Sequence, residues 1–390
     1  MPNPDEVAEV HANGFVYDRW DWIEVEARIG NVARHIRLRV MEIGDISHGF
    51  KNVRLKVGDT ATVKLAGRSV ITDGTVTVRQ VAYSATTHQI EIVVSTKTWR
   101  INNASPKLQQ FTKASLSQIA NAVLGPLGTS FYLSGNTGGA DKPFERISTA
   151  LGETVKQFIE RMARMRDIHL TDDPQGRLVG LRGGTAPEGS LAATPVAFPA
   201  FPSLPRAIAT LVEGDNIKEL HGVMSSLEAV NTIGTVGQNF GNDEHGGSQA
   251  SDVYAEVTNN LPATAPAIFQ FAAEEPADKV DVQMRASHEN AAVTATFIQV
   301  YITVQGWLMD NGTLWIEHVV PVQPFRIFSP MMFPNDWASL YLRGVSHRQN
   351  NQEGTITVLE FTLLNAIAPF GQIGGPDIND LLNPPNPPQT

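Results

Sequence analysis

Residues 152–182, GETVKQFIERMARMRDIHLTDDPQGRLVGLR, carry the clearest structural signal in the chain. Apolar side chains recur there at spacings of three and four, which places them on one face of an α-helix, while charged side chains fill the opposite face. The stretch therefore predicts an amphipathic helix with one buried face. The apolar face holds Val155, Phe158, Ile159, Met162 and Ala163, and the charged face holds Lys156, Glu160, Arg161 and Arg164.

A tight turn follows this helix. The helical pattern ends at Asp167 and His169, and residues 172–176 read DDPQG. Proline presets φ for the first position of a turn, and glycine accepts the positive φ that such turns require. We expect strands around Leu170 and Leu178 to pair across this turn and to cover the helix. The unit contains no catalytic pattern.

The chain on either side of this unit shows the alternation of β-strands. Residues 23–103 alternate apolar and polar side chains in short runs separated by turns, which predicts a small barrel or sandwich. Residues 207–370 repeat the pattern around a stretch of helical composition at 278–295. Alternation leaves one face of each sheet polar, so we expect that face to meet solvent, a lumen or a partner.

The composition is that of a folded protein with several domains. The chain has 390 residues, 42% of them hydrophobic, and a net charge of −10 that disfavours stable binding to DNA. It contains no cysteine, which excludes disulfides and suits a reducing cytoplasm. The first residues lack the pattern of a signal peptide, and no apolar run is long enough to span a membrane, so neither is expected.

The motifs of common enzymes are absent or incomplete. No Gly-Lys dipeptide occurs, which excludes a P-loop. His288-Glu289 opens like a zinc-protease helix, but position 292 is alanine and supplies no second imidazole. We therefore predict no enzyme activity, no catalytic, cofactor-binding or metal-binding residue, and no cofactor.

Charged clusters are interpreted as solvated surface. The acidic pairs Asp172-Asp173 and Glu274-Glu275 could in principle serve glycoside hydrolysis, which needs two carboxylates, but both lie in turn or loop sequence. Two basic groups could meet an acidic partner, although a solvated surface is the default interpretation. These groups are the helix edge Arg161, Arg164 and Arg166 and the strand face Arg34, Arg37 and Arg39.

The helix opening Gly152-Glu153-Thr154 with its Asp-Asp hairpin resembles a stretch in baseplate hub proteins of contractile-tailed bacteriophages, the phage Mu type with a T-even hub-like fold. Residues 306–315 (GWLMDNGTLW), 354–363 (GTITVLEFTL) and 368–370 (APF) resemble the same family near the C-terminal end. The order and separation of these motifs carry the resemblance, which spans most of the chain.

This resemblance implies a fold that is mainly β with α+β, in a hub-protein architecture. Its expected parts are a first tube-like β-barrel domain (residues 1–105), a smaller α+β domain with a helix and a β-hairpin (106–195), and a second tube-like β domain (196–370). The second domain is expected to carry an inserted or peripheral loop and helix region at about 237–295. A flexible tail rich in proline and glycine is predicted for residues 371–390.

The function implied is structural. A homotrimer would form a pseudo-six-fold ring that adapts the tail tube to the three-fold central spike and lets DNA pass. Expected partners are the central spike, the tail tube or tube-initiator protein and the baseplate wedge proteins, with DNA only in transit and no stable membrane insertion. The expected location is the virion tail baseplate, assembled in the host bacterial cytoplasm. Two alternatives stay open: a receptor- or carbohydrate-binding protein of the tail tip, and a tail-associated cell-wall hydrolase.

Overall fold

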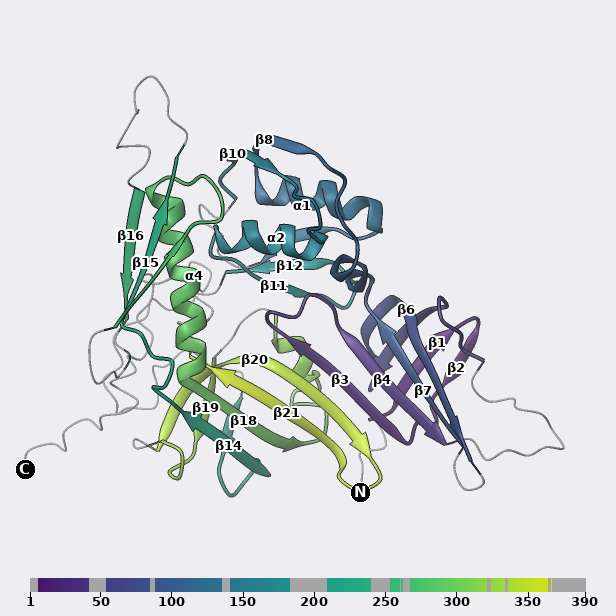
Figure 1. The fold of residues 1–390 in the computed structure, drawn as a ribbon. Coiled ribbons are helices and arrows are strands. Elements are labelled where there is room, and N and C mark those ends of the chain that lie inside the picture. The colour runs from purple at the N-terminus through teal and green to yellow at the C-terminus, as the bar shows by residue number, and fades with distance from the viewer. Residues whose placement is uncertain are drawn as a thin grey trace, which may run out of the picture.

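Figure 1 shows the computed structural model of the chain. The structure describes residues 6–41, 54–84, 88–134, 141–182, 209–239, 253–259, 261, 267–320, 324–333, 336–363 and 366. The proline-rich composition of residues 183–205 predicts a linker or an extended edge segment. This stretch and the predicted tail at 371–390 lie outside the described residues.

Strands β1 to β7 form the first β region, as the alternation at residues 23–103 predicts. In β4, Ile36 and Leu38 are fully buried, whereas the alternate residues His35 and Arg37 are exposed. Successive side chains therefore point alternately to the core and to the surface. The strands are β1 (Ala8–Ala12), β2 (Phe15–Tyr17), β3 (Trp22–Arg28), β4 (His35–Met41), β5 (Thr60–Leu65), β6 (Arg68–Tyr83) and β7 (His88–Ser95).

The α+β region follows the short 3-10 helix η1 (Lys97–Asn102). Helix α2 buries the predicted apolar stripe, and β11 pairs antiparallel with β12 across the predicted turn, with Thr171 opposite Val179. Strand β9 joins β12 in parallel. The elements of the region are β8 (Gln110–Ala114), α1 (Leu116–Leu124), η2 (Gly125–Leu127), β9 (Phe131–Ser134), β10 (Phe144–Ser148), α2 (Val155–Arg164), β11 (His169–Asp172) and β12 (Leu178–Leu181).

Both α-helices of this region begin with a capping box. The Ser115 hydroxyl accepts a hydrogen bond from the Gln118 backbone, and the Gln118 side chain accepts one from the Ser115 backbone. Thr154 and Gln157 make the same reciprocal pair at the start of α2. These bonds satisfy backbone donors that the first helical turn leaves unpaired, which fixes where each helix starts.

The second β region contains a main set of strands and a separate small sheet. The small sheet, β15 to β17, packs on α4 through Ile233, Val257 and Ala286. Helix α4 confirms the helix predicted from the composition of residues 278–295. The bounds are β13 (Thr210–Val212), β14 (Glu219–Met224), β15 (Thr232–Gly237), β16 (Val253–Thr258), β17 (Ile268–Ala272), α4 (Lys279–Phe297), β18 (Ile298–Gln305), η3 (Trp315–His318), β19 (Pro324–Phe328), β20 (Trp337–Asn350) and β21 (Gly354–Thr362).

One sheet of 13 strands joins the two β regions. Its path runs β14-β18-β21-β20-β3-β4-β7-β6-β5-β1-β2, with β19 on β20 and β13 on β19. The junction is the antiparallel pairing of β20 with β3, from Gly344 opposite Arg28 to Asn350 opposite Trp22. Figure 1 shows β20 and β3 side by side at the centre of the molecule, below the α+β region. We call this pairing the β3–β20 seam.

The glycine of the Gly306-Trp307 motif is required by a close contact. Gly306 has φ +81°, and a Cβ there would lie 2.7 Å from Glu6 Oε1. The Glu6 carboxylate accepts hydrogen bonds from the backbone N–H groups of Trp307, at 2.6 Å, and Leu308, at 3.2 Å. The motif therefore ties the second β region to the residue that precedes β1.

The apolar core is continuous through both β regions and includes Val25, Leu38, Leu342 and Phe361. The α+β region has its own core, which reaches Val282 of α4. The predicted fold class, mainly β with α+β, is confirmed. The domain boundaries at 105, 195 and 370 stay predictions. Among the described residues, no helix combines the length and apolarity needed to cross a membrane.

Candidate functional site

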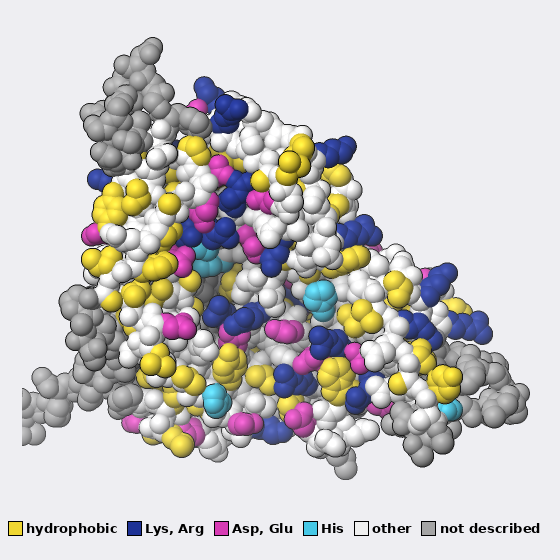
Figure 2. Space-filling model, viewed as in Figure 1, with side chains coloured by type: hydrophobic (Ala, Val, Ile, Leu, Met, Phe, Trp, Pro, Cys, Tyr) yellow, Lys and Arg dark blue, Asp and Glu magenta, His cyan; other side chains and the backbone are white. Residues whose placement is uncertain are grey.

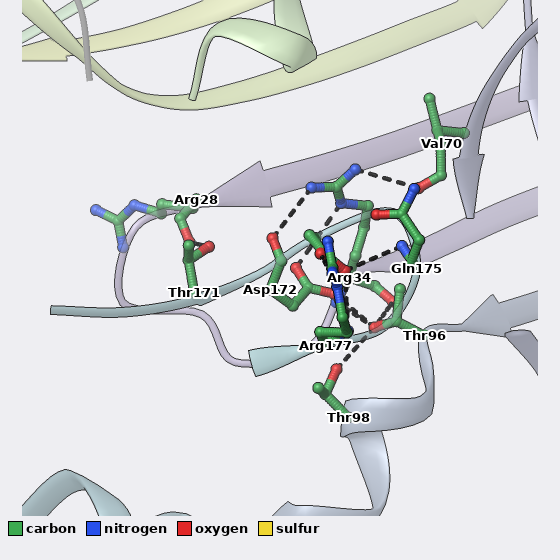
Figure 3. Close-up of polar contacts among 10 residues, drawn as sticks. Arg28, Arg34, Val70, Thr96, Thr98, Thr171, Asp172, Gln175 and Arg177 are labelled. Atoms are coloured by element: carbon green, nitrogen blue, oxygen red, sulfur yellow. Dashed lines mark hydrogen bonds and ion pairs between the residues drawn. The ribbon is translucent and has the colours of Figure 1, made fainter. Parts of the chain in front are cut away.

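A buried ion pair joins the α+β region to the first β region. Arg34 is 5% exposed and Asp172, at the end of β11, is 2% exposed. Asp172 Oδ2 accepts hydrogen bonds from the Arg34 backbone N–H at 2.9 Å and from the Thr96 hydroxyl at 2.6 Å. The Arg34 guanidinium lies 3.8 Å from Asp172 Oδ1 and donates to the Val70 carbonyl (Figure 3). We call this cluster the hairpin joint.

The turn itself is fixed by the second carboxylate. Asp173 Oδ1 accepts from the backbone N–H groups of Gln175 and Arg177, and its Oδ2 accepts from Arg177 Nε at 2.7 Å. Gly176 has φ +71°, and a Cβ there would lie 2.8 Å from the Lys97 backbone nitrogen. The turn is thus pressed against the first β region.

The prediction that Asp172 and Asp173 are solvated is wrong, because the turn folds onto Arg34 and η1. Both carboxylates are buried. Burial raises the pKa of Asp172 above its ordinary value, against the charge of Arg34 and the hydrogen bond of Thr96, which act to lower it. A shallow hollow of about 230 Å³ beside them is lined by Arg34, both aspartates and Arg177. The hydrogen bonds already occupy these carboxylates, so they do not form a free acid–base pair.

A second polar contact joins α2 to α4. The fully buried Arg166 donates to Asp281 Oδ1 at 2.6 Å, and its guanidinium lies 3.8 Å from the Phe144 ring centroid. Lys142 Nζ lies 3.4 Å from the same Asp281 oxygen. Desolvation lowers the pKa of Arg166 and raises that of Asp281, in each case against the attraction of the partner charge. We call the contact between α2 and α4 the helix joint.

The acidic pair Glu274-Glu275 belongs to the helix joint. Arg164 Nε donates to Glu274 Oε1 at 3.0 Å, Arg285 Nε lies 2.9 Å from Glu274 Oε2, and Arg161 pairs with Glu275. Burial is the largest single influence and acts to raise the pKa of Glu274, but the hydrogen bonds and the charges of Arg285 and Arg164 together hold the pKa below its ordinary value. Figure 2 shows charged side chains of both signs gathered where α4 meets the α+β region.

The interpretation of the acidic pair and the basic helix edge as solvated surface is therefore wrong for Glu275, Arg161 and Arg166, whose side chains are largely buried in ion pairs. Glu274 remains an exposed residue and Arg164 is half-buried, although the two form an ion pair. The helix edge meets α4 and the segment before it, which supply the opposite charges. Sequence spacing within α2 could not show this, because the partners follow more than 100 positions later.

The three arginines of the predicted basic strand face differ in burial. Arg37 is exposed and lies 3.8 Å from Glu24, and the Arg39 guanidinium lies 5.5 Å from the Trp22 ring centroid, so these two arginines are on the surface as expected. Arg34 is buried instead. The physical reason is parity: in an extended chain, positions 34 and 37 point to opposite faces, and the buried residues Ile36 and Leu38 share the parity of Arg34. That signal was present in the sequence.

The fold is that of phage tail proteins. The structure resembles the 43 kDa tail protein of prophage MuSo2 from Shewanella oneidensis with a TM-score of 0.71 and 20% identity, covering 93% of this chain and 100% of that one. It resembles the tail protein from Neisseria meningitidis MC58 with a TM-score of 0.69 and 16% identity, covering 93% and 99%.

The structure also resembles, more distantly, a protein of a secretion system. The E. coli c3393 protein is a type VI secretion component with structural similarity to the T4 bacteriophage tail proteins gp27 and gp5. It matches with a TM-score of 0.51 and 10% identity, covering 91% of this chain and 76% of that one. No curated protein matches the sequence.

Residues 102–182 match the family model of the second domain of gp44-like baseplate hub proteins. This range runs from the end of η1 through β12. It contains the helix–hairpin unit, the carboxylates of the hairpin joint and Arg166 of the helix joint. The resemblance to baseplate hub proteins, which the sequence of residues 152–182 predicts, is confirmed there.

Proposed function

We propose that this chain is a structural baseplate hub of a contractile phage tail. In this role three copies form a ring that adapts the six-fold tail tube to the three-fold central spike and lets DNA pass. The observation that carries the proposal is the match of residues 102–182 to a baseplate hub domain, within a fold shared with phage tail proteins over 93% of the chain.

The two β regions support a ring with pseudo-six-fold symmetry. Each is built on antiparallel strands, and the β3–β20 seam holds both in one sheet with a continuous core. Three copies would place six such regions around an axis, which is the number that a six-fold tube presents. A rigid connection between the two regions of one copy would keep their spacing constant, since a backbone ladder leaves little freedom between neighbouring strands.

The electrostatics suit a passage for DNA. The net charge is −10, and a negative wall repels phosphates, so DNA would move past without being held. The proposed partners are the central spike, the tail tube or tube-initiator protein and the wedge proteins. The proposed location is the virion baseplate, after assembly in the host cytoplasm. This role needs no enzymatic activity.

The test is reconstitution of the ring. The chain is co-expressed with the spike and tube proteins of the same tail, and the purified complex is imaged by electron microscopy. We expect a three-fold ring with a central channel, seated on the spike. Failure to form any complex with either protein, together with glycan binding by the isolated chain on a carbohydrate array, would favour a receptor-binding role at the tail tip and overturn the proposal.

A further inference from the structure

Three potential metal ligands from separate elements meet at the helix joint. Asp167 lies between α2 and β11, His169 begins β11, and His288 lies in the middle of α4. Their ligand atoms all lie within 4.8 Å of one another, and Asp167 Oδ1 is 3.7 Å from His288 Nδ1. The two imidazole rings stack with centroids 4.7 Å apart and planes 25° apart.

Four polar atoms of this cluster are buried without a hydrogen-bond partner among the described residues. They are both carboxylate oxygens of Asp167, Nε2 of His169 and Nδ1 of His288. Asp167 is only 2% exposed. A buried carboxylate without a donor is strongly destabilising, so a fold that keeps one there needs a cation to neutralise it. Two imidazole nitrogens without a hydrogen-bond partner beside it indicate a cation that binds nitrogen.

No hydrogen bond from a histidine satisfies that carboxylate, because the gap of 3.7 Å between His288 Nδ1 and Asp167 Oδ1 exceeds hydrogen-bond length. The Arg343 guanidinium lies 3.7 Å from Glu360, on the side of the β3–β20 seam. A neutral imidazole is the form that coordinates a metal.

We propose that Asp167, His169 and His288 form a binding site for one transition-metal ion, with Zn²⁺ as the ion that fits best. Two imidazoles and one carboxylate are a usual donor set for zinc, and water would complete four-fold coordination. Zinc bonds of about 2.0–2.1 Å place tetrahedral donors roughly 3.4 Å apart, so the ligands close in by about 1 Å on binding.

A search for sequence motifs would not find this metal site. His288 lacks a second histidine one helical turn later, because position 292 is alanine. The second imidazole instead comes from β11 of the α+β region. The ion would therefore clamp α4 to the α+β region, in addition to the Arg166–Asp281 pair. This role is structural, and it does not depend on the proposed hub function.

The test uses the untagged full chain, stripped with a chelator and then incubated with one to two equivalents of ZnCl₂. We expect about one zinc per chain by elemental analysis after gel filtration, a higher melting temperature than the stripped protein, and loss of both effects in Asp167→Asn and His288→Gln. The control is His221→Gln, which removes an exposed imidazole on β14 and should retain the zinc.

Binding of Co²⁺ reports on the coordination of the ion, which a measurement of stability does not. Co²⁺ in place of zinc should produce the visible absorption of a four-coordinate ion in the wild-type chain and in His221→Gln, but not in His288→Gln. The proposal is overturned if the folded, stripped chain binds neither ion at 50 µM, or if Asp167→Asn and His288→Gln, shown to be folded by circular dichroism, bind as much as the wild type.

Discussion

The β3–β20 seam and the two polar joints hold the same molecule together by different means. The seam is a backbone ladder whose inward side chains, such as Val25, Val345 and Ile23, are apolar and buried. The hairpin and helix joints bury arginine and aspartate instead, whereas the seam buries one histidine, His347, among its apolar side chains. A buried apolar ladder tolerates other apolar side chains of suitable size, whereas a buried ion pair specifies its partner.

The seam and the joints therefore have different roles. The seam makes the two β regions one body, and the joints determine where the α+β region sits on that body. A buried pair contributes little net stability but is costly to break, so each joint selects one orientation of the α+β region. For a ring-forming protein, such fixed placement would matter as much as stability does.

The largest effect is expected from a charge placed in the seam. Val345 is 1% exposed on β20, and Val345→Asp would bury an unpaired carboxylate at a cost of several kcal/mol, a large part of a typical folding free energy of about 5–15 kcal/mol. We expect little soluble folded protein, measured by expression and circular dichroism. Val345→Thr has nearly the same shape without the charge and should fold. Normal folding of Val345→Asp would show that the seam is not a buried ladder.

At the hairpin joint, removal of a charge should lower the stability of the protein. Asp172→Asn keeps the shape of the side chain but leaves the Arg34 guanidinium buried without its counter-charge, which typically costs about 3–5 kcal/mol. The measurement is urea-induced unfolding at pH 7. The control is Asp310→Asn, which changes an exposed aspartate and should shift stability by less than about 0.5 kcal/mol.

A double variant sharpens that result. Arg34→Met with Asp172→Leu removes both charges together, and we expect it to recover part of the stability that Asp172→Asn loses, because no buried charge is then left unpaired. A double variant less stable than Asp172→Asn would mean that the joint acts through its hydrogen bonds to Thr96 and Val70 rather than through the ion pair.

The seam should also carry a pH dependence of intermediate size. Burial, with a smaller contribution from Arg34, lowers the pKa of His347 on β20 to about 3, below its unfolded value of 6.5. Below pH 6.5 the unfolded chain binds a proton that the folded chain excludes, so stability falls by about 1.4 kcal/mol per pH unit as the pH decreases toward 3. His347→Gln should flatten the curve between pH 6.5 and 4.5 in urea titrations. Parallel curves for the two proteins would exclude this origin.

The smallest effect is expected for a surface ion pair. Arg68 of β6 and Glu317 of η3 connect the two β regions through exposed side chains, with Nε 2.5 Å from Oε1. Such pairs contribute about 0–1 kcal/mol because water and salt screen them. Arg68→Gln should therefore leave the urea midpoint almost unchanged at 0.15 M salt. A loss above 2 kcal/mol would show that the regions depend on this bridge and not on the seam.

Local structure was predictable from the sequence where the signal is local. The stripe on α2 and the turn at Gly176 were visible in spacing and residue type, and they are confirmed. The burial of Arg34 also had a signal, since its parity matches that of Ile36 and Leu38. We grouped it with Arg37 by charge instead of by parity.

The joints were not predictable, because they depend on long-range pairing. Asp172 meets Arg34 across 138 positions, and Arg166 meets Asp281 across 115. The alternation of single strands does not reveal which strands become neighbours, so the 13-stranded sheet and its seam have no local signal. His169 and His288 come together only because α4 lies beside the start of β11.

The most direct test of the hub account is the mass of the chain in solution, measured by light scattering during gel filtration, alone and with the trimeric spike of the same tail. The account predicts three copies of the chain, either as a trimer of about 127 kDa, three times 42.4 kDa, for the chain alone, or as about 127 kDa of added mass on the spike. A monomer or two-fold dimer under both conditions would contradict it.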